Sequence, residues 1–464
     1  MWFGIGVFPH YLVAFFDLDS CRIKAGGGDA DVLGCPGAQG AGDRGAAGGG
    51  DRAGLAVQLA VVGDGARHVQ RQHLAAGVGQ ARAQSDAEVG AGEAEGGAAA
   101  SMGNVNDNDN WMVHFRDTMR GGKFLNHYRM AELHAKESPD RIWELEMWGA
   151  LFDRTKEGKI SQRNFGGHEY PRLAHVGDRT GLELIRTMQQ RIVALQQEDK
   201  AQFGDYEHRI RVFQELTITE ILKDNGKVSG AYGYWRETGD EVLFETSAIV
   251  LATGGIGKSF RVTSNSWEGT GDGHALALKA GGRLKDIEFV QFHPTGMVWP
   301  PSVRGLLVTE SVRGDGGVLR NTNGERFMFN YIPDVFKDKY ADNEAEADRW
   351  YTDQNNNRRP PELLPRDEVA RAINSEVKAG RGTPHGGVYL DVSTRLPAEE
   401  IKRRLPSMWH QFYELAGVDI TKEPMEVGPT AHYVMGGIDV DPDTAAAVGV
   451  PGLFAAGEVA AGMH

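Results

Sequence analysis

The pattern of apolar and polar positions divides the chain at about residue 100. Upstream, residues 25–100 consist largely of Ala and Gly, broken by Asp, Arg and Gln, with few aromatic or branched apolar side chains. Such a stretch buries too little apolar surface to offset its backbone entropy. We therefore expect residues 1–94 to be disordered or to derive from a misread gene. Residues 55–63 form an isolated strand-like run within them.

Downstream of this division, apolar positions recur with the periods of helices and strands. The helical period predicts four helices: 141–152, 181–197, 273–280 and 367–377. Alternation predicts three strands: 211–222, 227–235 and 241–245. The dipeptide Asn225-Gly226 predicts a tight turn between the first two of these strands. Residues 248–252 are continuously apolar and end in Thr-Gly-Gly, which is typical of a buried parallel strand whose end approaches a ligand.

Length, charge and cysteine content restrict the class of protein. A chain of 464 residues exceeds one hydrophobic core, so we expect at least two domains. The formal net charge of −14 argues against a nucleic-acid partner. Two cysteines provide neither a disulfide framework nor metal-ligand spacing, and we expect no metal site. No apolar run reaches the ~18 residues of a membrane span, so a partner would have to supply any membrane association.

Between residues 286 and 317, polar side chains interrupt two apolar segments. Pro294 disfavours the helical region for the residue before it, so we expect that residue, a histidine, to lie in extended chain. A His, a Thr hydroxyl, a Glu and an Arg at strand ends could bind a carboxylate and handle a proton. The four candidates are His293, Thr309, Glu310 and Arg313. Taken singly, each could equally be a satisfied polar group.

Four further polar residues have competing interpretations. Arg366 directly precedes an acidic pair at a helix start, against the preference of the helix dipole, which indicates either a functional placement or an ion pair with Asp367. Helix N-capping explains Asp272. Glu458 follows an apolar strand and a glycine, where a carboxylate usually needs a buried partner, and His432 alone fits a packed polar residue.

The G-x-G-x-x-G at residues 40–45 lacks a preceding strand and is rejected as a nucleotide-binding turn.

Taken together, the motifs resemble the flavoprotein subunit of succinate dehydrogenase and fumarate reductase. The likeness extends from residue 95 to residue 464. No single motif is diagnostic, but their order and spacing are specific. The segments that carry the likeness are 165–168 (Phe-Gly-Gly-His), 178–181 (Asp-Arg-Thr-Gly), 251–255, 270–273, 288–296, 309–314, 366–367, 432–437 and 455–458.

The resemblance implies an α/β fold. A Rossmann-like FAD-binding domain would occupy residues 95–285, incomplete because its first βαβ unit is missing. An α+β capping domain would be inserted at residues 286–431, and the chain would return to the FAD-binding domain at residues 432–464.

The resemblance also implies an activity, in which FAD exchanges a hydride with succinate or fumarate through its N5 atom. Arg366 would transfer the proton, with Glu310 and Arg313 as its relay. His293, Thr309 and His432 would bind the substrate carboxylates. The expected FAD contacts are Asp272, Glu458, Gly254 and Gly255. The implied partners are a membrane anchor, which would hold the protein on the cytoplasmic face of the cell membrane, and an iron–sulfur subunit.

Three parts of the family pattern are not found. Residues 1–94 contain no first strand with its Gly-rich turn, and residues 85–94 contain no histidine for covalent attachment of FAD. At the other end, the chain stops before the Asn-Arg-Leu-Gly-Gly-Asn segment of the family. We interpret this as an interrupted or misread gene. Two alternatives remain, an L-aspartate oxidase-like flavoenzyme and a catalytically dead fragment.

Overall fold

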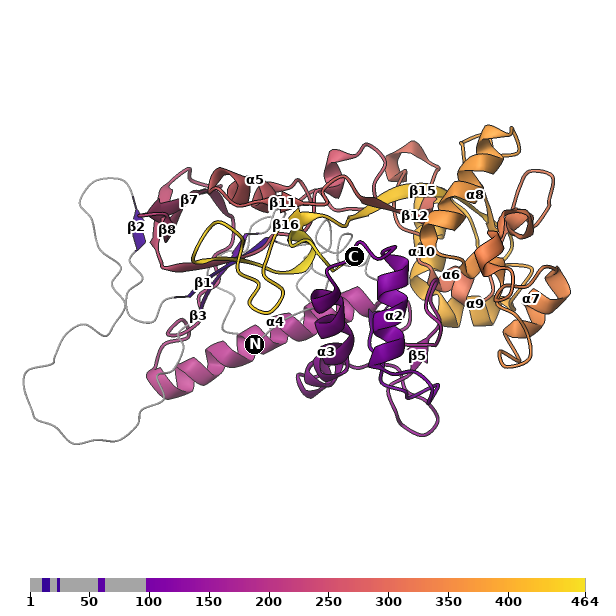
Figure 1. Cartoon of the computed structure of the whole chain (residues 1–464), viewed down its shortest axis with the longest axis horizontal. Coiled ribbons are helices and arrows are strands. Elements are labelled where there is room, and N and C mark those ends of the chain that lie inside the picture. The colour runs from indigo at the N-terminus through magenta and orange to yellow at the C-terminus, as the bar shows by residue number, and fades with distance from the viewer. Residues whose placement is uncertain (1–10, 17–22, 26–56, 63–96, 464) are drawn as a thin grey trace, which may run out of the picture.

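The structure is a computed structural model that describes residues 11–16, 23–25, 57–62 and 97–463, with side chains described for 97–463 (Figure 1). Its long axis runs from a group of sheets at one end to a helix-rich domain at the other (Figure 1). Among these residues, no helix has the length and apolarity that crossing a bilayer requires. Most of the expected disordered stretch at 1–94 lies outside the described residues, so that expectation stays a prediction.

A four-stranded sheet with the order β17-β10-β1-β3 underlies the first domain. Strand β10 (Ala248–Ala252) has the predicted bounds and pairs in parallel with β17 (Leu453–Ala455). Strand β1 (Tyr11–Phe16) pairs antiparallel with β10, so it does not provide the parallel first strand of a nucleotide-binding unit. Strand β3 (Val57–Val62) pairs with β1, so the run at residues 55–63 is not isolated.

A second sheet, with the order β2-β9-β8-β7, packs beside the first. Strands β8 (Lys227–Trp235) and β9 (Glu241–Glu245) have the predicted bounds. Strand β7 (Leu216–Asp224) starts later than expected, because Glu215 has a φ of 57° that interrupts the extended chain. The short β2 (Ile23–Ala25) pairs with β9. The turn at Asn225-Gly226 is confirmed, with φ values of 49° and 81°.

Four longer helices belong to the first domain: α2 (Trp111–Gly121), α3 (Tyr128–Met147), α4 (Thr180–Phe203) and α5 (Asp272–Lys279). The prediction of a helix over 141–152 is wrong in its bounds. Helix α3 already begins at Tyr128, in a polar stretch whose buried positions include two alanines that carry little hydrophobic signal. It ends before Gly149, which has a φ of 103°.

The capping domain is built on an antiparallel sheet with the order β12-β15-β14-β13. Its strands are β12 (Val290–Met297), β15 (Met425–Val434), β14 (Val388–Asp391) and β13 (Val318–Arg320). Its helices are α6 (Ser311–Gly314), α7 (Glu344–Trp350), α8 (Arg366–Lys378), α9 (Ala398–Arg404) and α10 (Pro406–Ala416). Strand β15 crosses the expected domain boundary at residue 431, so His432 lies on a capping-sheet strand.

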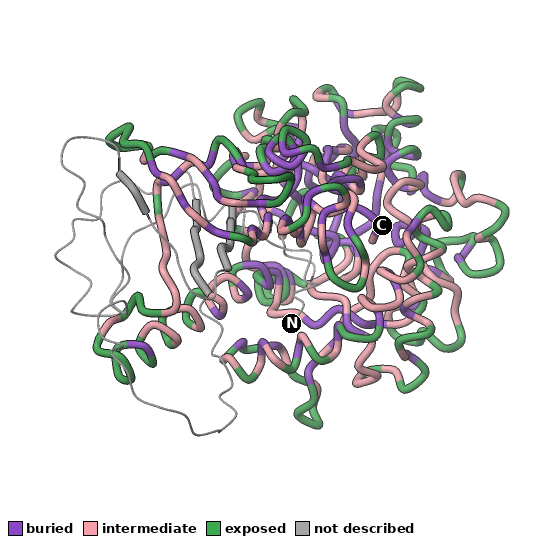
Figure 2. The backbone as a smooth tube through the Cα atoms, turned by 60° about the vertical axis from the view of Figure 1, so that its left-hand side comes forward, coloured by how far each residue is buried: buried purple, intermediate pink, exposed green. Residues whose placement is uncertain are grey.

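Each of the two domains has its own core, and polar contacts join them. Buried backbone follows the sheets of both domains (Figure 2). Asp178 of the first domain accepts hydrogen bonds from the backbone N–H groups of Ser407 (2.8 Å) and Met408 (3.2 Å), in the first turn of α10. A carboxylate there satisfies N–H groups that have no partner within the helix. The segment 178–181 of the first domain thereby caps helix α10 of the domain built on the β12-β15-β14-β13 sheet.

Candidate active site

Arg366, Glu310 and Arg313 form a continuous charged chain. Helix α8 begins at Arg366, and its Nε donates a hydrogen bond to Glu310 Oε2 at 3.1 Å. The same oxygen lies 3.4 Å from Arg313 Nη2. Glu310 is 3% exposed and Arg313 is fully buried. The structure therefore brings together the three residues expected to move the proton.

The carboxylate of Glu310 and the guanidinium groups of Arg313 and Arg366 stabilise each other's charged forms. Burial by itself raises the pKa of Glu310, but Arg313 and Arg366 outweigh it and keep that pKa below its usual range. The backbone N–H of Gly166 also donates to Glu310 Oε1 at 2.6 Å. Burial lowers the pKa of Arg313, which the carboxylate of Glu310 opposes. Glu310 is therefore a carboxylate at neutral pH that can accept a proton from either guanidinium.

Arg366 has two further contacts that fix its orientation. Its Nη1 donates to Gln291 Oε1 at 2.6 Å, from strand β12. Its guanidinium lies 4.9 Å from the centre of the Phe165 ring. Sequence reasoning assigned no role to Gln291 or Phe165, although both stand in motifs that carry the family likeness. With Glu310, these contacts hold the guanidinium from three directions.

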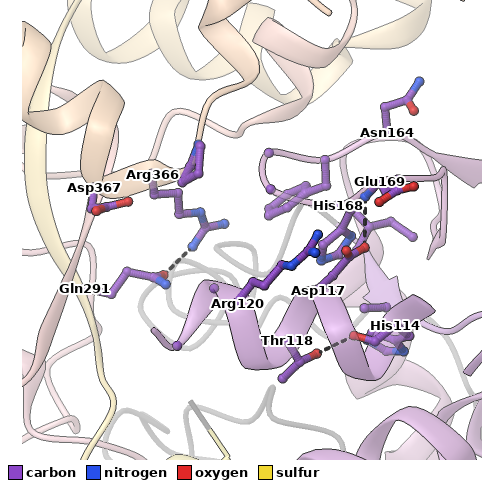
Figure 3. Close-up of a pocket in the computed structure, with 18 of the residues that line it drawn as sticks. His114, Asp117, Thr118, Arg120, Asn164, His168, Glu169, Gln291, Arg366 and Asp367 are labelled. Carbon is purple, nitrogen blue, oxygen red and sulfur yellow. Dashed lines mark hydrogen bonds between the residues drawn. The ribbon is translucent and has the colours of Figure 1, made fainter. Parts of the chain in front are cut away.

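A cavity of about 1480 Å³ lies in front of Arg366. Gln291, Arg366 and Asp367 line one side of it, and Arg120 and His168 face them across the space (Figure 3). His432 also lines the cavity. Arg366 thus joins an open space, large enough for a cofactor and a small substrate, to a buried carboxylate.

The two candidate histidines lie side by side, with ring centres 5.2 Å apart. His293 is buried in β12, with Nε2 at 3.0 Å from Val308 O, and its Nδ1 has no hydrogen-bond partner among the described residues. His432 Nδ1 lies 2.6 Å from Ser264 Oγ. Burial and the charge of Arg366 lower the pKa of His432 to about 3 and that of His293 well below its usual value. Both rings are therefore neutral at neutral pH.

Thr309 lies behind the surface of the cavity rather than on it. Its side chain is buried, and its hydroxyl donates to Ser311 Oγ at 3.2 Å. Ser311 Oγ in turn accepts a hydrogen bond from Arg163. Of the three expected carboxylate-binding residues, only His432 lines the cavity in this arrangement.

Gly254, Gly255 and Glu458 come together where β10 and β17 end. A Cβ on Gly255 would lie 2.2 Å from Glu458 Oε1, so a side chain there would displace the Glu458 carboxyl. Glu458 Oε1 accepts a hydrogen bond from the Val434 N–H at 3.0 Å, and burial raises the pKa of Glu458 to about 7. Gly254 has a φ of 69°. Bare backbone and a carboxyl that can donate near neutral pH fit the polar edge of a flavin or its ribityl chain.

The interpretation of Asp272 as a helix cap is wrong. Gly271, with a φ of 89°, occupies the cap position of α5, and Asp272 is the first helical residue. Its side chain accepts a hydrogen bond from the Thr270 hydroxyl at 3.2 Å. A carboxylate in the first turn still interacts favourably with the helix dipole. A contact between Asp272 and FAD stays a prediction.

Comparison with known proteins identifies the family. The family model described as "FAD binding domain" matches residues 84–464. The chain belongs to this FAD-binding family. The cofactor is therefore FAD, and the expected α/β FAD-binding fold is confirmed. The position expected for the attachment histidine, residues 85–94, lies outside the described residues.

Individual relatives and a solved structure show which members of the family this chain is similar to. The chain is 45% identical over 352 residues to one component of the fumarate reductase (CoM/CoB) of Methanothermobacter marburgensis, covering 76% of this chain and 56% of the relative. It is 35% identical over 368 residues to the fumarate reductase flavoprotein subunit of Escherichia coli, covering 77% and 55%. The solved structure of Mycobacterium smegmatis Sdh1 in complex with UQ1 matches at 69% identity and a TM-score of 0.64, covering 81% of this chain and 58% of that one.

These matches confirm the resemblance to the succinate dehydrogenase and fumarate reductase flavoproteins. The chain spans a little over half the length of the curated relatives it matches. What the whole protein acts on and assembles with is therefore a matter for proposal.

Gly255→Val is expected to remove most of the bound FAD. The added side chain would displace Glu458 from the end of β17, whose carboxyl we place at the flavin. Visible flavin absorbance per purified chain measures the loss. Gly269→Ala is the matched control, since its Cβ would meet its nearest neighbours at an ordinary 3.6 Å. Equal flavin content in the two variants would contradict the assignment.

Proposed function

We propose that this chain is the catalytic part of a FAD-dependent oxidoreductase that interconverts succinate and fumarate. The observation that carries the proposal is Arg366, which lines the cavity and bonds to the buried Glu310. The names of the relatives, which are fumarate reductase and succinate dehydrogenase subunits, support the choice of substrate.

FAD, when bound, supplies the acceptor or donor of the hydride. Arg366 then takes a proton from succinate, or delivers one to fumarate, at the carbon next to the one that exchanges the hydride. An arginine is a poor base in water because its pKa exceeds ~12. Here Glu310 offers a charged acceptor 3.1 Å away, so the guanidinium can pass one proton on as it receives another. Arg313 continues the chain into the protein interior.

The neutral histidines suit a dicarboxylate site. His432 can donate a hydrogen bond to a carboxylate without carrying a charge of its own, which leaves Arg366 as the nearby cation. We place His293 and Thr309 at the same carboxylates. Because both are buried behind the cavity surface, their contact with substrate requires the groups that cover them to move.

We further propose that the protein works beside a membrane anchor and an iron–sulfur subunit, on the cytoplasmic face of the cell membrane. Support comes from the relatives, whose names describe them as subunits. Electrons that leave the flavin need an acceptor, which the iron–sulfur partner would supply. Among the residues that the structure describes, no group of His, Cys, Asp and Glu could hold a metal.

Turnover of succinate against L-aspartate tests the proposal. We expect the purified holoenzyme to reduce an artificial electron acceptor with succinate and not with L-aspartate. Oxidation of L-aspartate would instead favour the aspartate oxidase alternative. A flavin-loaded enzyme that oxidised neither substrate would overturn the proposed function.

FAD is expected to be held without a covalent bond. The sequence has no histidine between His73 and His114, the region where the family attaches the cofactor. Denaturation should therefore release all the flavin, leaving no fluorescent protein band in a denaturing gel. A fluorescent band would show that another side chain forms the bond.

A further inference from the structure

The loop Phe165–His168, between β5 (Gln162–Arg163) and β6 (Leu173–Ala174), contacts the charged chain from the FAD-binding side. Its Gly166 N–H donates to Glu310, and its Phe165 ring lies against Arg366. A Cβ on Gly166 would lie 2.5 Å from Glu310 Oε1 and 3.0 Å from Leu364 O. A side chain at residue 166 would therefore push on the Glu310 carboxylate and on the Leu364 carbonyl.

Arg359 of the capping domain binds the same loop at both of its ends. Its Nη2 donates to Phe165 O at 2.7 Å, and its Nη1 donates to His168 O. Its guanidinium lies 5.6 Å from the centre of the Trp350 ring. Within residues 97–463 it forms no ion pair with a carboxylate. Its hydrogen bonds are thus directed to the loop backbone, where a planar fork can serve two carbonyls at once.

Backbone hydrogen bonds fix the position of Arg359. Its backbone N–H donates to Lys339 O at 3.1 Å, and its carbonyl accepts from the Ala341 N–H at 2.8 Å. Seven residues further along the chain comes Arg366, at the start of α8. The segment that leads to the proton-transferring residue therefore also holds the loop that contacts its guanidinium.

We propose that Arg359 is a positioning residue that clamps loop 165–168 of the FAD-binding domain onto the capping domain, so that Gly166 and Phe165 hold Glu310 and Arg366 in place for proton transfer. This inference rests on the proposed function. Arg366, Glu310 and Arg313 all belong to the capping domain, whereas Gly166 and Phe165 do not. The proton path is consequently held in this geometry only while the loop contacts the capping domain.

Arg359→Gln, compared with Arg358→Gln, tests the clamp. Arg358 is the adjacent residue, but its guanidinium binds Glu346 and Asp342 within the capping domain and does not contact the loop. We expect Arg359→Gln to lower kcat for succinate about tenfold, the size of one lost hydrogen bond to a charged group, with little change in KM. Arg358→Gln should leave both constants near those of the wild type, because its partners Glu346 and Asp342 belong neither to the loop nor to the proton path.

The pH profile separates a clamp from a general loss of structure. Gly166 stabilises the charged form of Glu310, while Arg313, Arg366 and the nearby Tyr340 belong to the capping domain and stay in place. Release of the loop removes the Gly166 donor and raises the pKa of Glu310, so the acid limb of succinate oxidation should move to higher pH. Arg358→Gln should not move it.

Two more variants keep the test decisive if Arg359→Gln fails to fold. Gly166→Ala pushes directly on Glu310 and should give the same loss of kcat and the same shift. Arg359→Lys keeps one donor and should recover part of both. The clamp would be overturned if Arg359→Gln kept the wild-type kcat and acid limb, or if Arg358→Gln lost as much activity as Arg359→Gln. In either case, succinate oxidation by the wild type would still uphold the proposed function. A wild type that did not oxidise succinate would overturn both.

Discussion

Arg366→Gln is expected to lower kcat for succinate oxidation by about 10³-fold or more while FAD stays bound, because proton transfer by a positioned side chain contributes about 10²–10⁴-fold. The loss should fall on kcat rather than on substrate affinity, since the interaction removed acts in the transition state. Arg366→Lys should not restore the rate. Lysine has a single nitrogen on a shorter side chain and lacks the planar fork that bonds Glu310 through Nε and Gln291 through Nη1.

Steady-state kinetics with flavin quantified in each sample checks this prediction. Arg371→Gln is the matched control on the same helix, because Arg371 is exposed and pairs only with Asp367 (2.8 Å) and Glu368 (2.7 Å) among the described residues. If Arg366→Gln kept more than about a tenth of the wild-type rate, a loss below ~1.4 kcal/mol, another residue would have to carry the proton.

Arg172→Met is expected to destabilise the fold by about 3–5 kcal/mol, the cost of leaving a buried charge without its partner. Arg172 is fully buried between Asp109 and Asp117, with N···O distances of 2.8 and 2.9 Å. Burial already raises the pKa of Asp109 to about 6. The loss should therefore be smaller below pH ~6, where Asp109 can become neutral.

Denaturant unfolding at several pH values measures this loss. Arg116→Met is the control, on helix α2 beside Asp117, because its ion pair with Glu169 (2.7 Å) is exposed and should contribute less than about 1 kcal/mol. Equal midpoints for the two variants would show that the Asp109–Arg172–Asp117 network does not stabilise the fold.

Local patterns in the sequence predicted the regular elements of the first domain well. A continuous apolar run located β10, and alternation with a turn dipeptide located β8 and its hairpin. Each of these elements is specified by neighbouring residues. Helix α3 was missed over residues 128–140 because several of its buried positions are Ala and Ser rather than large apolar residues.

The candidate site came from the resemblance to a family, and its internal contacts could not be derived from the sequence. Gly166 and Glu310 are 144 residues apart along the chain, and Gln291 and Arg366 are 75 apart. The first contact joins the two domains and the second joins β12 to α8 within the capping domain, and no local period encodes either. The sequence also did not show that Thr309 bonds Ser311 rather than lining the cavity, because the cavity is formed by segments far apart along the chain.

The most direct test of the central claim is the absorbance of the bound flavin after anaerobic mixing with substrate. Succinate should bleach the visible flavin band of the holoenzyme within the time of one turnover, and excess fumarate should restore it. L-Aspartate should leave the band unchanged. Bleaching by L-aspartate but not by succinate, or by neither, would contradict the assignment of this chain to the interconversion of succinate and fumarate.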